Sequence, residues 1–424
     1  MKLSADMLRA HGLDLLDFLR RGVFAVLIGL LVGAVGVAFH YGIDLVTQLR
    51  QAHNWFILLL PVGGLAIILL YRACGMEQDR GTNLVLVAVR EHEPMHLRTA
   101  PLIFLSTCIT HLVGGSAGRE GAALQLGASI SNKIAHAMGV EPEEGRMLTV
   151  CGMAAAFSAL FGTPLTAAVF ALEVVHVGVI QYAALVPAFL SSLVGYLLAG
   201  WMGVAPTAYA VSGLPGLAAG PLVQVIVLGG LCALLSILFC KTMHTVGRLY
   251  AQFLPDPRLR AVVGGCIMVA LSLLDGGLAD QVYNGAGGNL IEAAVNGNGA
   301  GVAPWAFLVK ILFTTLTLGA GFRGGEIVPT FACGATFGCT VAPLLGLSPS
   351  FGGAVGVVAA FCGVTNCPLS SILLAYELFG GRGLPLFALA IAVSYRLSGY
   401  TGLYSEQQIV YSKIIPRQIN KKAE

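Results

Sequence analysis

Long apolar stretches separated by glycine- and proline-rich breaks dominate the chain. No Asp, Glu, Lys or Arg occurs from Val174 to Cys240, and a second charge-free run extends from Ile327 to Tyr376. One membrane-spanning helix needs only about 20 apolar residues, so each run must hold several passes. The pattern predicts an all-α polytopic membrane protein.

The apolar segments fall into two classes by length. Ten are predicted to span the membrane: 22–46, 55–74, 100–114, 147–160, 181–200, 221–244, 258–274, 302–319, 349–364 and 383–398. Six are too short, or too closely bounded by Gly and Pro, to cross alone. These shorter segments, which pair off between the two halves of the chain, are 82–90, 120–136, 164–177, 288–296, 328–341 and 368–380.

Two stretches of the sequence repeat one another at an offset of 204 residues. Residues 152–173 read GMAAAFSALFGTPLTAAVFALE, and residues 356–377 read GVVAAFCGVTNCPLSSILLAYE. The same offset pairs Arg119 with Arg323. In membrane transporters such repeats bracket a transport site, because their broken helices meet at the bilayer midplane.

Composition and charge support a membrane protein and limit its partners. Charged residues make up 11% of the chain and the mean hydropathy is +0.82, whereas soluble chains carry about 25% charged residues. A net charge of +3 without a clustered basic face argues against a nucleic-acid partner. Basic residues between Lys2 and Arg21 and after Lys413 indicate that both termini are cytoplasmic, because Lys and Arg accumulate on that side.

These features predict four parts and no cytoplasmic regulatory domain. The parts are a cytoplasmic N-terminal segment 1–21, a first membrane repeat 22–200, a second membrane repeat 201–411 and a cytoplasmic tail 412–424.

The sequence offers no constellation for a metal, a cofactor or covalent catalysis. Its ten cysteines and nine histidines lack metal-ligand or disulfide spacing, so we expect the cysteines to be packing residues. An intramembrane enzyme is the rival interpretation from another class. The absence of HExxH, Ser/His and GxxxxGK[ST] patterns disfavours it.

Two glycine-flanked helix starts are candidates for an anion site. The sequence GREGA at 118–122 precedes one short segment, and GGEIVP at 324–329 precedes another. Glycines permit sharp turns that expose backbone N–H groups, and a helix N-terminus carries about half a positive charge. Glu120 at such a start could occupy the anion's place when ionised and leave it when protonated. The alternative is that these glycines only allow close helix packing and that Glu120 is a solvated residue at the interface.

Three other charged residues lie in apolar surroundings. Lys310 interrupts a membrane segment, where a charge is costly; it is either functional or a structural anchor paired with a carboxylate or with helix-end carbonyls. Glu173 and Glu377 occupy equivalent places in the two repeats, which favours a structural role that both repeats share.

The motifs resemble those of the CLC family of chloride channels and anion/proton antiporters, from about Gly81 to Tyr404. GREGA is similar to the family's GREGP, which puts Glu120 in the place of the external gating glutamate, and residues 324–329 are similar to GGxFxP. GTNLV at 81–85 stands where the family has GSGIP, and Tyr404 stands where it has the pore tyrosine. The resemblance implies a homodimer with one anion pathway per subunit, each subunit being an inverted repeat whose broken helices meet at the midplane.

Departures from the family pattern point to one branch. Val174 stands where chloride/proton antiporters have an internal proton-transfer carboxylate, and Asn83 and Glu326 resemble the form found in bacterial fluoride/proton antiporters. That branch often has Met where Thr82 stands and Thr where Val328 stands. Fluoride is small and strongly hydrated, so a site that dehydrates it requires compact hydrogen-bond donors.

We therefore expect a fluoride/proton antiporter that exports fluoride across the inner membrane of a bacterium, with fluoride, protons, the lipid bilayer and a second copy of the chain as partners. A chloride channel or chloride/proton exchanger of the same family is the alternative. Glu120 is the expected gating and proton-carrying residue. The expected anion-binding residues are Gly81, Thr82, Asn83, Gly118, Arg119, Gly121, Gly324, Gly325, Glu326, Ile327, Val328 and Tyr404.

Overall fold

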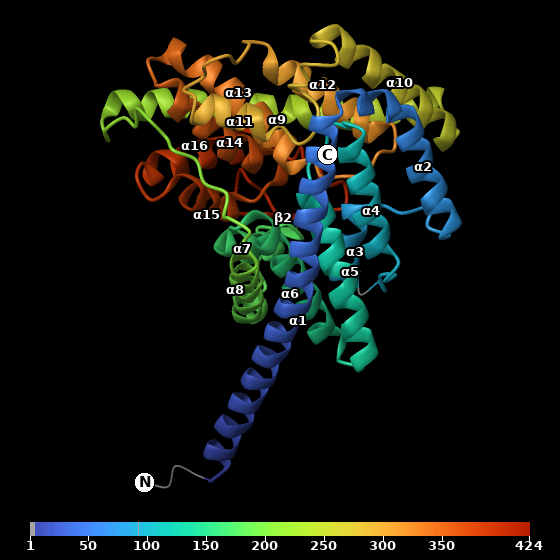
Figure 1. Ribbon diagram of the computed structural model, residues 1–424. Helices are drawn as coiled ribbons and strands as arrows, with labels where there is room; N and C mark the ends of the chain where they lie inside the picture. Colours follow the sequence, from blue (N-terminus) through green and yellow to red (C-terminus); the bar gives the residue numbers. More distant parts are fainter. Residues whose placement is uncertain (1–4, 92) are drawn as a thin grey trace.

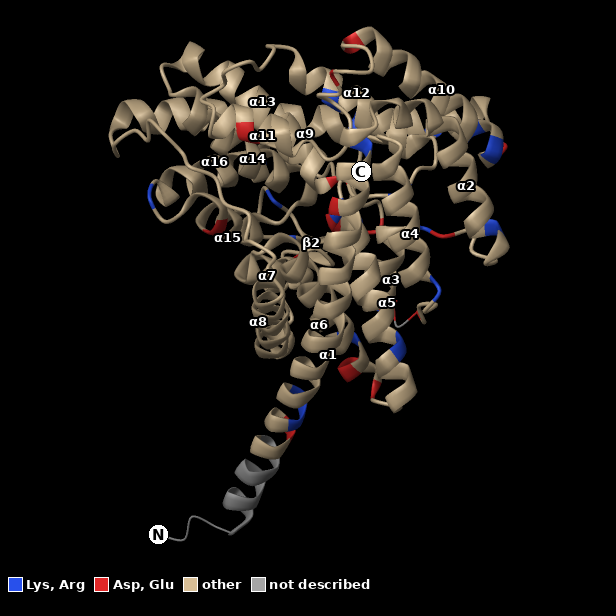
Figure 2. Cartoon of the chain, viewed as in Figure 1, with Lys and Arg blue, Asp and Glu red and all other residues tan. Residues whose placement is uncertain are grey.

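Sixteen α-helices joined by short connections make up most of the computed structural model, which describes residues 5–91 and 93–424 and side chains from Leu15 onward. Lys2 and the side chain of Arg9, part of the predicted basic N-terminus, lie outside the described residues. Six helices are long and apolar enough to cross a membrane. In Figure 2 most of the helical ribbon is tan, and charged residues gather mainly at helix ends and in loops.

The first half of the chain contributes eight helices, which occupy one part of the molecule (Figure 1). They are α1 (Ala5–Ala52), α2 (Leu60–Ala73), α3 (Thr82–Glu91), α4 (Thr99–Leu112), α5 (Glu120–Met138), α6 (Pro142–Phe161), α7 (Pro164–Glu173) and α8 (Leu185–Trp201).

The second half contributes the other eight, which lie beside the first group (Figure 1). They are α9 (Ala219–Phe253), α10 (Pro257–Asp275), α11 (Gly288–Val295), α12 (Ala306–Gly319), α13 (Ile327–Val341), α14 (Pro349–Thr365), α15 (Pro368–Phe379) and α16 (Leu384–Leu397). Short 3-10 turns lie at Asn54–Leu59, Tyr182–Ala184 and Ala342–Leu345.

Each of the sixteen predicted apolar segments overlaps one of these helices, so the predicted fold class is confirmed. The lengths of several helical segments differ from expectation. Within the described residues, the segment Ile327–Leu345, which was predicted to be too short to cross alone, is long and apolar enough to span a membrane. Helix α1 begins at Ala5 rather than near residue 22, because the residues before the apolar stretch continue the helix. Helices α4, α12 and α16 have 14 residues each, fewer than the roughly 20 that a straight crossing requires.

The two halves pack their central helices in the same way. Helix α5 crosses α6 where a Cβ on Gly127 would collide with the carbonyl oxygen of Gly152, and α13 crosses α14 where a Cβ on Gly334 would collide with that of Gly356. Only glycine permits such close backbone approach between membrane helices. The matching crossings show that the chain contains a structural repeat.

The repeat does not keep one offset, and the pairing of Arg119 with Arg323 predicted from sequence is wrong. Helices α5 and α13 begin 207 residues apart, whereas α6 and α14 end 204 residues apart. The reason is that α6 has 20 residues and α14 has 17, and the additional turn of α6 lies before its crossing with α5. The sequence match around α6 and α14 therefore does not extend to the helix starts.

Two glutamates join the repeats at the beginnings of α7 and α15. The carboxylate of Glu377 accepts hydrogen bonds from the backbone amides of residues 165–166, at 2.8 and 2.9 Å. Glu173 accepts from the amides of Leu369 and Ser370, at 3.1 and 2.9 Å. Each carboxylate thus caps the first turn of a helix in the other repeat, where N–H groups lack intrahelical partners.

We expect Glu173→Ala and Glu377→Ala each to lower the free energy of unfolding by about 1–3 kcal/mol, because buried amides lose a charged acceptor. Thermal unfolding of the purified protein in detergent would measure this. Glu77→Ala is the matched control, since Glu77 makes an exposed ion pair with Arg72 and such pairs contribute little. Stabilities equal to that of the control would contradict the capping role.

The C-terminal part of the chain forms a small three-stranded sheet with residues that follow α7. The sequence analysis did not predict this sheet. Strand β1 (His176–Val177) pairs in parallel with β2 (Gln408–Tyr411), and β2 pairs antiparallel with β3 (Gln418–Lys422). Ile409 is buried at its centre. The sheet holds the segment that follows Tyr404 against the end of α7.

Candidate anion pathway

The structure brings together the two glycine-rich segments that precede α5 and α13. Gly118 and Gly325 exchange two backbone hydrogen bonds, each 2.7 Å long. Side chains have no room there, since a Cβ on Gly118 would lie 2.7 Å from Glu120 Oε2 and one on Gly324 would lie 2.6 Å from the Ala117 Cβ. The two helix starts therefore meet through their backbones.

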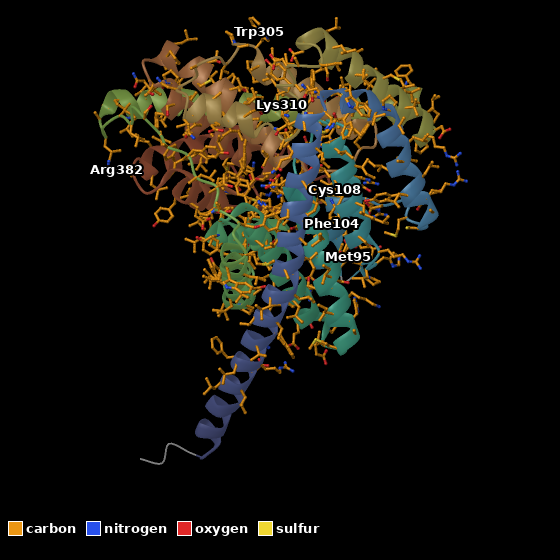
Figure 3. The ribbon with its side chains drawn as sticks, in the orientation of Figure 1. Met95, Phe104, Cys108, Trp305, Lys310 and Arg382 are labelled. Atoms are coloured by element: carbon orange, nitrogen blue, oxygen red, sulfur yellow. The ribbon has the colours of Figure 1, made fainter. Side chains whose placement is uncertain are left out.

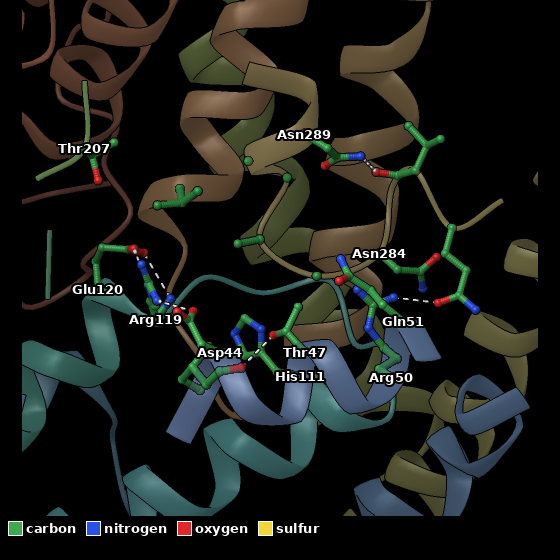
Figure 4. A pocket seen from close by; sticks show the side chains of 18 of the residues that line it. Asp44, Thr47, Arg50, Gln51, His111, Arg119, Glu120, Thr207, Asn284 and Asn289 are labelled. Atoms are coloured by element: carbon green, nitrogen blue, oxygen red, sulfur yellow. Dashed lines mark hydrogen bonds and ion pairs between the residues drawn. The ribbon is translucent and has the colours of Figure 1, made fainter. Parts of the chain in front are cut away.

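Glu120, the first residue of α5, is 1% exposed and lies at this meeting point. Its Oε2 accepts a hydrogen bond of 3.0 Å from the Arg119 amide, and the backbone amide of Val328, in the first turn of α13, also faces the carboxylate. The Arg119 guanidinium lies 4.0 Å from Glu120 Oε1 and 3.4 Å from Asp44 Oδ1 (Figure 4). The carboxylate thus occupies a place that the two helix starts make favourable for negative charge.

A cavity of about 630 Å³ leads to Glu120. Its lining carries both signs of charge, with Arg50 and Arg119 opposed by Asp44 (Figure 4) and by Asp280. Other lining residues are His111, Val328 and the segment 284–289. Because Glu120 and Val328 both line it, an ion in this cavity reaches the helix starts directly.

Polar side chains flank the other side of the α5 start. A Cβ on Gly121 would lie 3.2 Å from Glu326 Oε2 and 3.3 Å from Thr82 Oγ1. Gln125 Nε2 donates a hydrogen bond of 3.1 Å to that Thr82 oxygen. Sequence reasoning missed Gln125, although its place four residues after Gly121 puts both on one face of α5.

Three polar atoms in this region are buried without a hydrogen-bond partner: Glu326 Oε2, Gln125 Oε1 and the Tyr404 hydroxyl. Tyr404 itself is 2% exposed. The two oxygens of Glu326 and Gln125 can accept a hydrogen bond, and the Tyr404 hydroxyl can accept or donate one.

Gly81 and Asn83 hold the start of α3 in place. Gly81 adopts a φ of +61°, which favours glycine. Asn83 Oδ1 accepts a hydrogen bond of 3.1 Å from the Glu406 amide, so this side-chain oxygen ties α3 to the segment after Tyr404. Arg323 pairs with Asp79 at 3.3 Å just before α3.

The other predicted positions are buried within the fold. Ile327 begins α13 and is fully buried. Val174 is also fully buried, and its carbonyl oxygen accepts a hydrogen bond of 2.9 Å from Gln407 Nε2. A valine with a neutral amide beside it offers no proton carrier at this position. Lys310 lies behind the wall of the cavity and does not line it.

Comparisons with known proteins agree with this architecture. The chain is 35% identical over 413 residues to a chloride/fluoride channel protein of Pseudomonas syringae pv. tomato, covering 96% of this chain and 90% of the relative. It is 25% identical to the H(+)/Cl(-) exchange transporter ClcA of Vibrio cholerae, covering 90% and 87%.

Solved structures show the same fold. The crystal structure of a CLC-type fluoride/proton antiporter superposes with a TM-score of 0.87 at 32% identity, covering 92% of this chain and 98% of the other. A slow cyanobacterial Cl−/H+ antiporter superposes with a TM-score of 0.74 at 18% identity, covering 89% and 94%. The family described as voltage gated chloride channel matches residues 63–399. Taken with the paired helix starts, these matches show that the chain belongs to the CLC family of anion channels and transporters, which is not an enzyme family.

Proposed function

We propose that the protein is a fluoride/proton antiporter that exports fluoride, with Glu120 as its gating and proton-carrying residue. The observation that carries the proposal is the position of the Glu120 carboxylate, which occupies the meeting point of two helix starts in the wall of a cavity. That place attracts an anion of any kind, and here the anion is a side chain that can be protonated.

The exchange follows from competition for this place. When ionised, the Glu120 carboxylate accepts from backbone amides and excludes a free anion. Protonation removes its charge and weakens those hydrogen bonds, so the side chain leaves and a free anion replaces it. Proton binding and anion binding are therefore linked, and protons moving inward drive fluoride outward.

Fluoride is favoured by the small polar groups near the helix starts and by the relatives. The Thr82 and Tyr404 hydroxyls and the backbone N–H groups are compact donors suited to a small, strongly hydrated ion. A relative at 35% identity carries fluoride in its name, and a structure at 32% identity is of a fluoride/proton antiporter. Val174 stands where, by the resemblance, chloride/proton antiporters have an internal proton-transfer carboxylate.

The same proposal includes the setting of the protein. We infer a homodimer in the inner membrane of a bacterium, with both termini cytoplasmic. The excess of Lys and Arg near the two ends of the chain supports this orientation.

A chloride channel or chloride/proton exchanger is the second candidate, because chloride stands in the name of the Pseudomonas relative and in that of the Vibrio relative. Both candidates use the same helix starts, so they differ in ion preference and not in architecture.

Reconstitution into liposomes distinguishes the two. We expect an outward fluoride gradient to drive proton uptake into the liposomes, measured with a pH indicator. An equal chloride gradient should drive at most about a tenth of that proton flux, which is the factor for losing one hydrogen bond to the ion. Protein-free liposomes are the control. Equal proton fluxes with both anions, or anion flux without proton flux, would contradict the proposal and favour the second candidate.

A further inference from the structure

Lys310, in the middle of α12, is fully buried within the body of the protein (Figure 3). Its Nζ donates three hydrogen bonds: to the carbonyl oxygens of Tyr283 and Gly285, at 2.9 and 2.7 Å, and to Ser116 Oγ, at 2.9 Å. Among the described residues no ion pair includes Lys310. No carboxylate therefore neutralises this side chain.

The three acceptors match the charged form of the lysine. An ammonium group has three donors and no acceptor. The two carbonyl oxygens can only accept, and the Ser116 hydroxyl can accept from Lys310 while donating to Thr314 Oγ1, 3.0 Å away. Every proton of the ammonium group thus has a partner, so the group can stay positive within the membrane region.

The acceptors belong to two segments that form the pathway. Gly285 lines the cavity that leads to Glu120, and Ser116 precedes Glu120 by four residues. The two segments also bind each other, because the Gly285 amide donates to the Gly115 carbonyl at 3.2 Å and Asn284 Nδ2 donates to the Gly114 carbonyl at 2.7 Å. Lys310 binds both segments from the side away from the cavity.

We propose that Lys310 is a positioning residue that supplies a fixed positive charge behind the wall of the anion pathway. A buried charge without a counter-ion acts over a longer range than a solvated one, so it raises the affinity of the cavity for anions without touching them. Its hydrogen bond to Ser116 also fixes the segment that carries Glu120. This inference rests on the proposed transport function, and it names Lys310 as a charge that attracts anions to the cavity.

The test is anion binding by isothermal titration calorimetry on the purified protein, with fluoride and with chloride. We expect Lys310→Met to weaken binding of both anions about tenfold, the effect of one charge acting through the protein interior. Ser116→Ala keeps the charge and should change affinity by less than about threefold, because the carbonyl oxygens of Tyr283 and Gly285 still hold the ammonium group. Lys133→Met is the matched control, because Lys133 is exposed on α5.

A transport assay distinguishes the loss of the Lys310 charge from general damage to the fold. In liposomes Lys310→Met should raise the KM for the anion while the number of protons moved per anion stays as in the wild type, because Glu120 is intact. Unchanged anion affinity in Lys310→Met would overturn the inference. A loss in Ser116→Ala as large as in Lys310→Met would overturn the role of the charge.

A second variant covers the case in which Lys310→Met does not fold. Lys310→Arg keeps the charge and should retain anion affinity within about threefold, whereas a tenfold loss would contradict the charge role. The binding test is also independent of the choice of anion. If the wild type binds chloride but not fluoride, the proposed function fails, and the effect of Lys310 on chloride binding still decides this inference.

Discussion

Glu120→Gln is expected to abolish proton movement coupled to the anion while the protein remains folded. Glutamine has nearly the same shape as the protonated carboxylate, but it cannot release a proton in the relevant pH range. The amides of Arg119 and Val328 that face the carboxylate would then meet a neutral group, which an anion displaces readily. Proton flux driven by a fluoride gradient should fall below detection in liposomes, and passive anion flux should persist.

Glu143→Gln is the control for this experiment, because Glu143 is 76% exposed at the start of α6 and pairs with Arg146 at the surface. That variant should transport as the wild type does. Proton flux that survives in Glu120→Gln would show that another group carries the proton. Glu326, whose Oε2 is buried without a partner beside Gly121, would be the next residue to test.

Four helix starts in the described part of the protein contact a buried carboxylate, in two different ways. The starts of α7 and α15 are capped by Glu377 and Glu173, each held by two backbone amides of the other repeat. The starts of α5 and α13 meet at Glu120, whose Oε2 accepts one hydrogen bond, from the amide of Arg119 at the start of its own helix. In the proposed mechanism the carboxylates of Glu173 and Glu377 stay at their helix starts, whereas the Glu120 carboxylate leaves when it is protonated and a free anion replaces it. We therefore expect anion binding at the starts of α5 and α13 and not at those of α7 and α15.

Much of the fold could be predicted from sequence because the membrane imposes a strong rule. Backbone groups in a bilayer must be satisfied within helices, so each apolar stretch between glycines and prolines became a helix. The position of Glu120 followed from the same reasoning, since glycines beside a carboxylate mark a helix start with exposed amides. These inferences used local sequence only.

The remaining features depend on contacts between distant segments, which local patterns do not contain. The additional turn of α6 shifts the repeat by three residues, and sequence identity around α6 and α14 hid that shift. The hydrogen bond that Asn83 Oδ1 accepts from the Glu406 amide, 323 residues away in the chain, could not be predicted either. Gln125 could not be predicted as a site residue, because a single glutamine in an apolar helix belongs to no recognisable motif. Its importance lies in the hydrogen bond to Thr82, from another helix.

Thr82→Val is expected to lower the preference for fluoride over chloride about tenfold, if one hydrogen bond to the ion, worth roughly 1.5 kcal/mol, is lost. Thr82 Oγ1 already accepts from Gln125 Nε2, so the hydroxyl proton is left to donate to an anion. A small ion gains more from this compact donor than a large one does. Fluxes of both anions through liposomes, compared as a ratio, would measure the change.

The controls for Thr82 separate the hydroxyl from shape and position. Thr82→Ser keeps the hydroxyl and should keep the fluoride-to-chloride flux ratio. Thr107→Val removes a buried hydroxyl of α4 that has no hydrogen-bond partner, and it should also leave this ratio unchanged. Asn83→Ala frees the segment after Tyr404 and also removes the Nδ2 donor of the side chain, so it should slow both anions. If Thr82→Val kept the wild-type ratio, discrimination would have to come from other donors, and the Tyr404 hydroxyl would be the next to test.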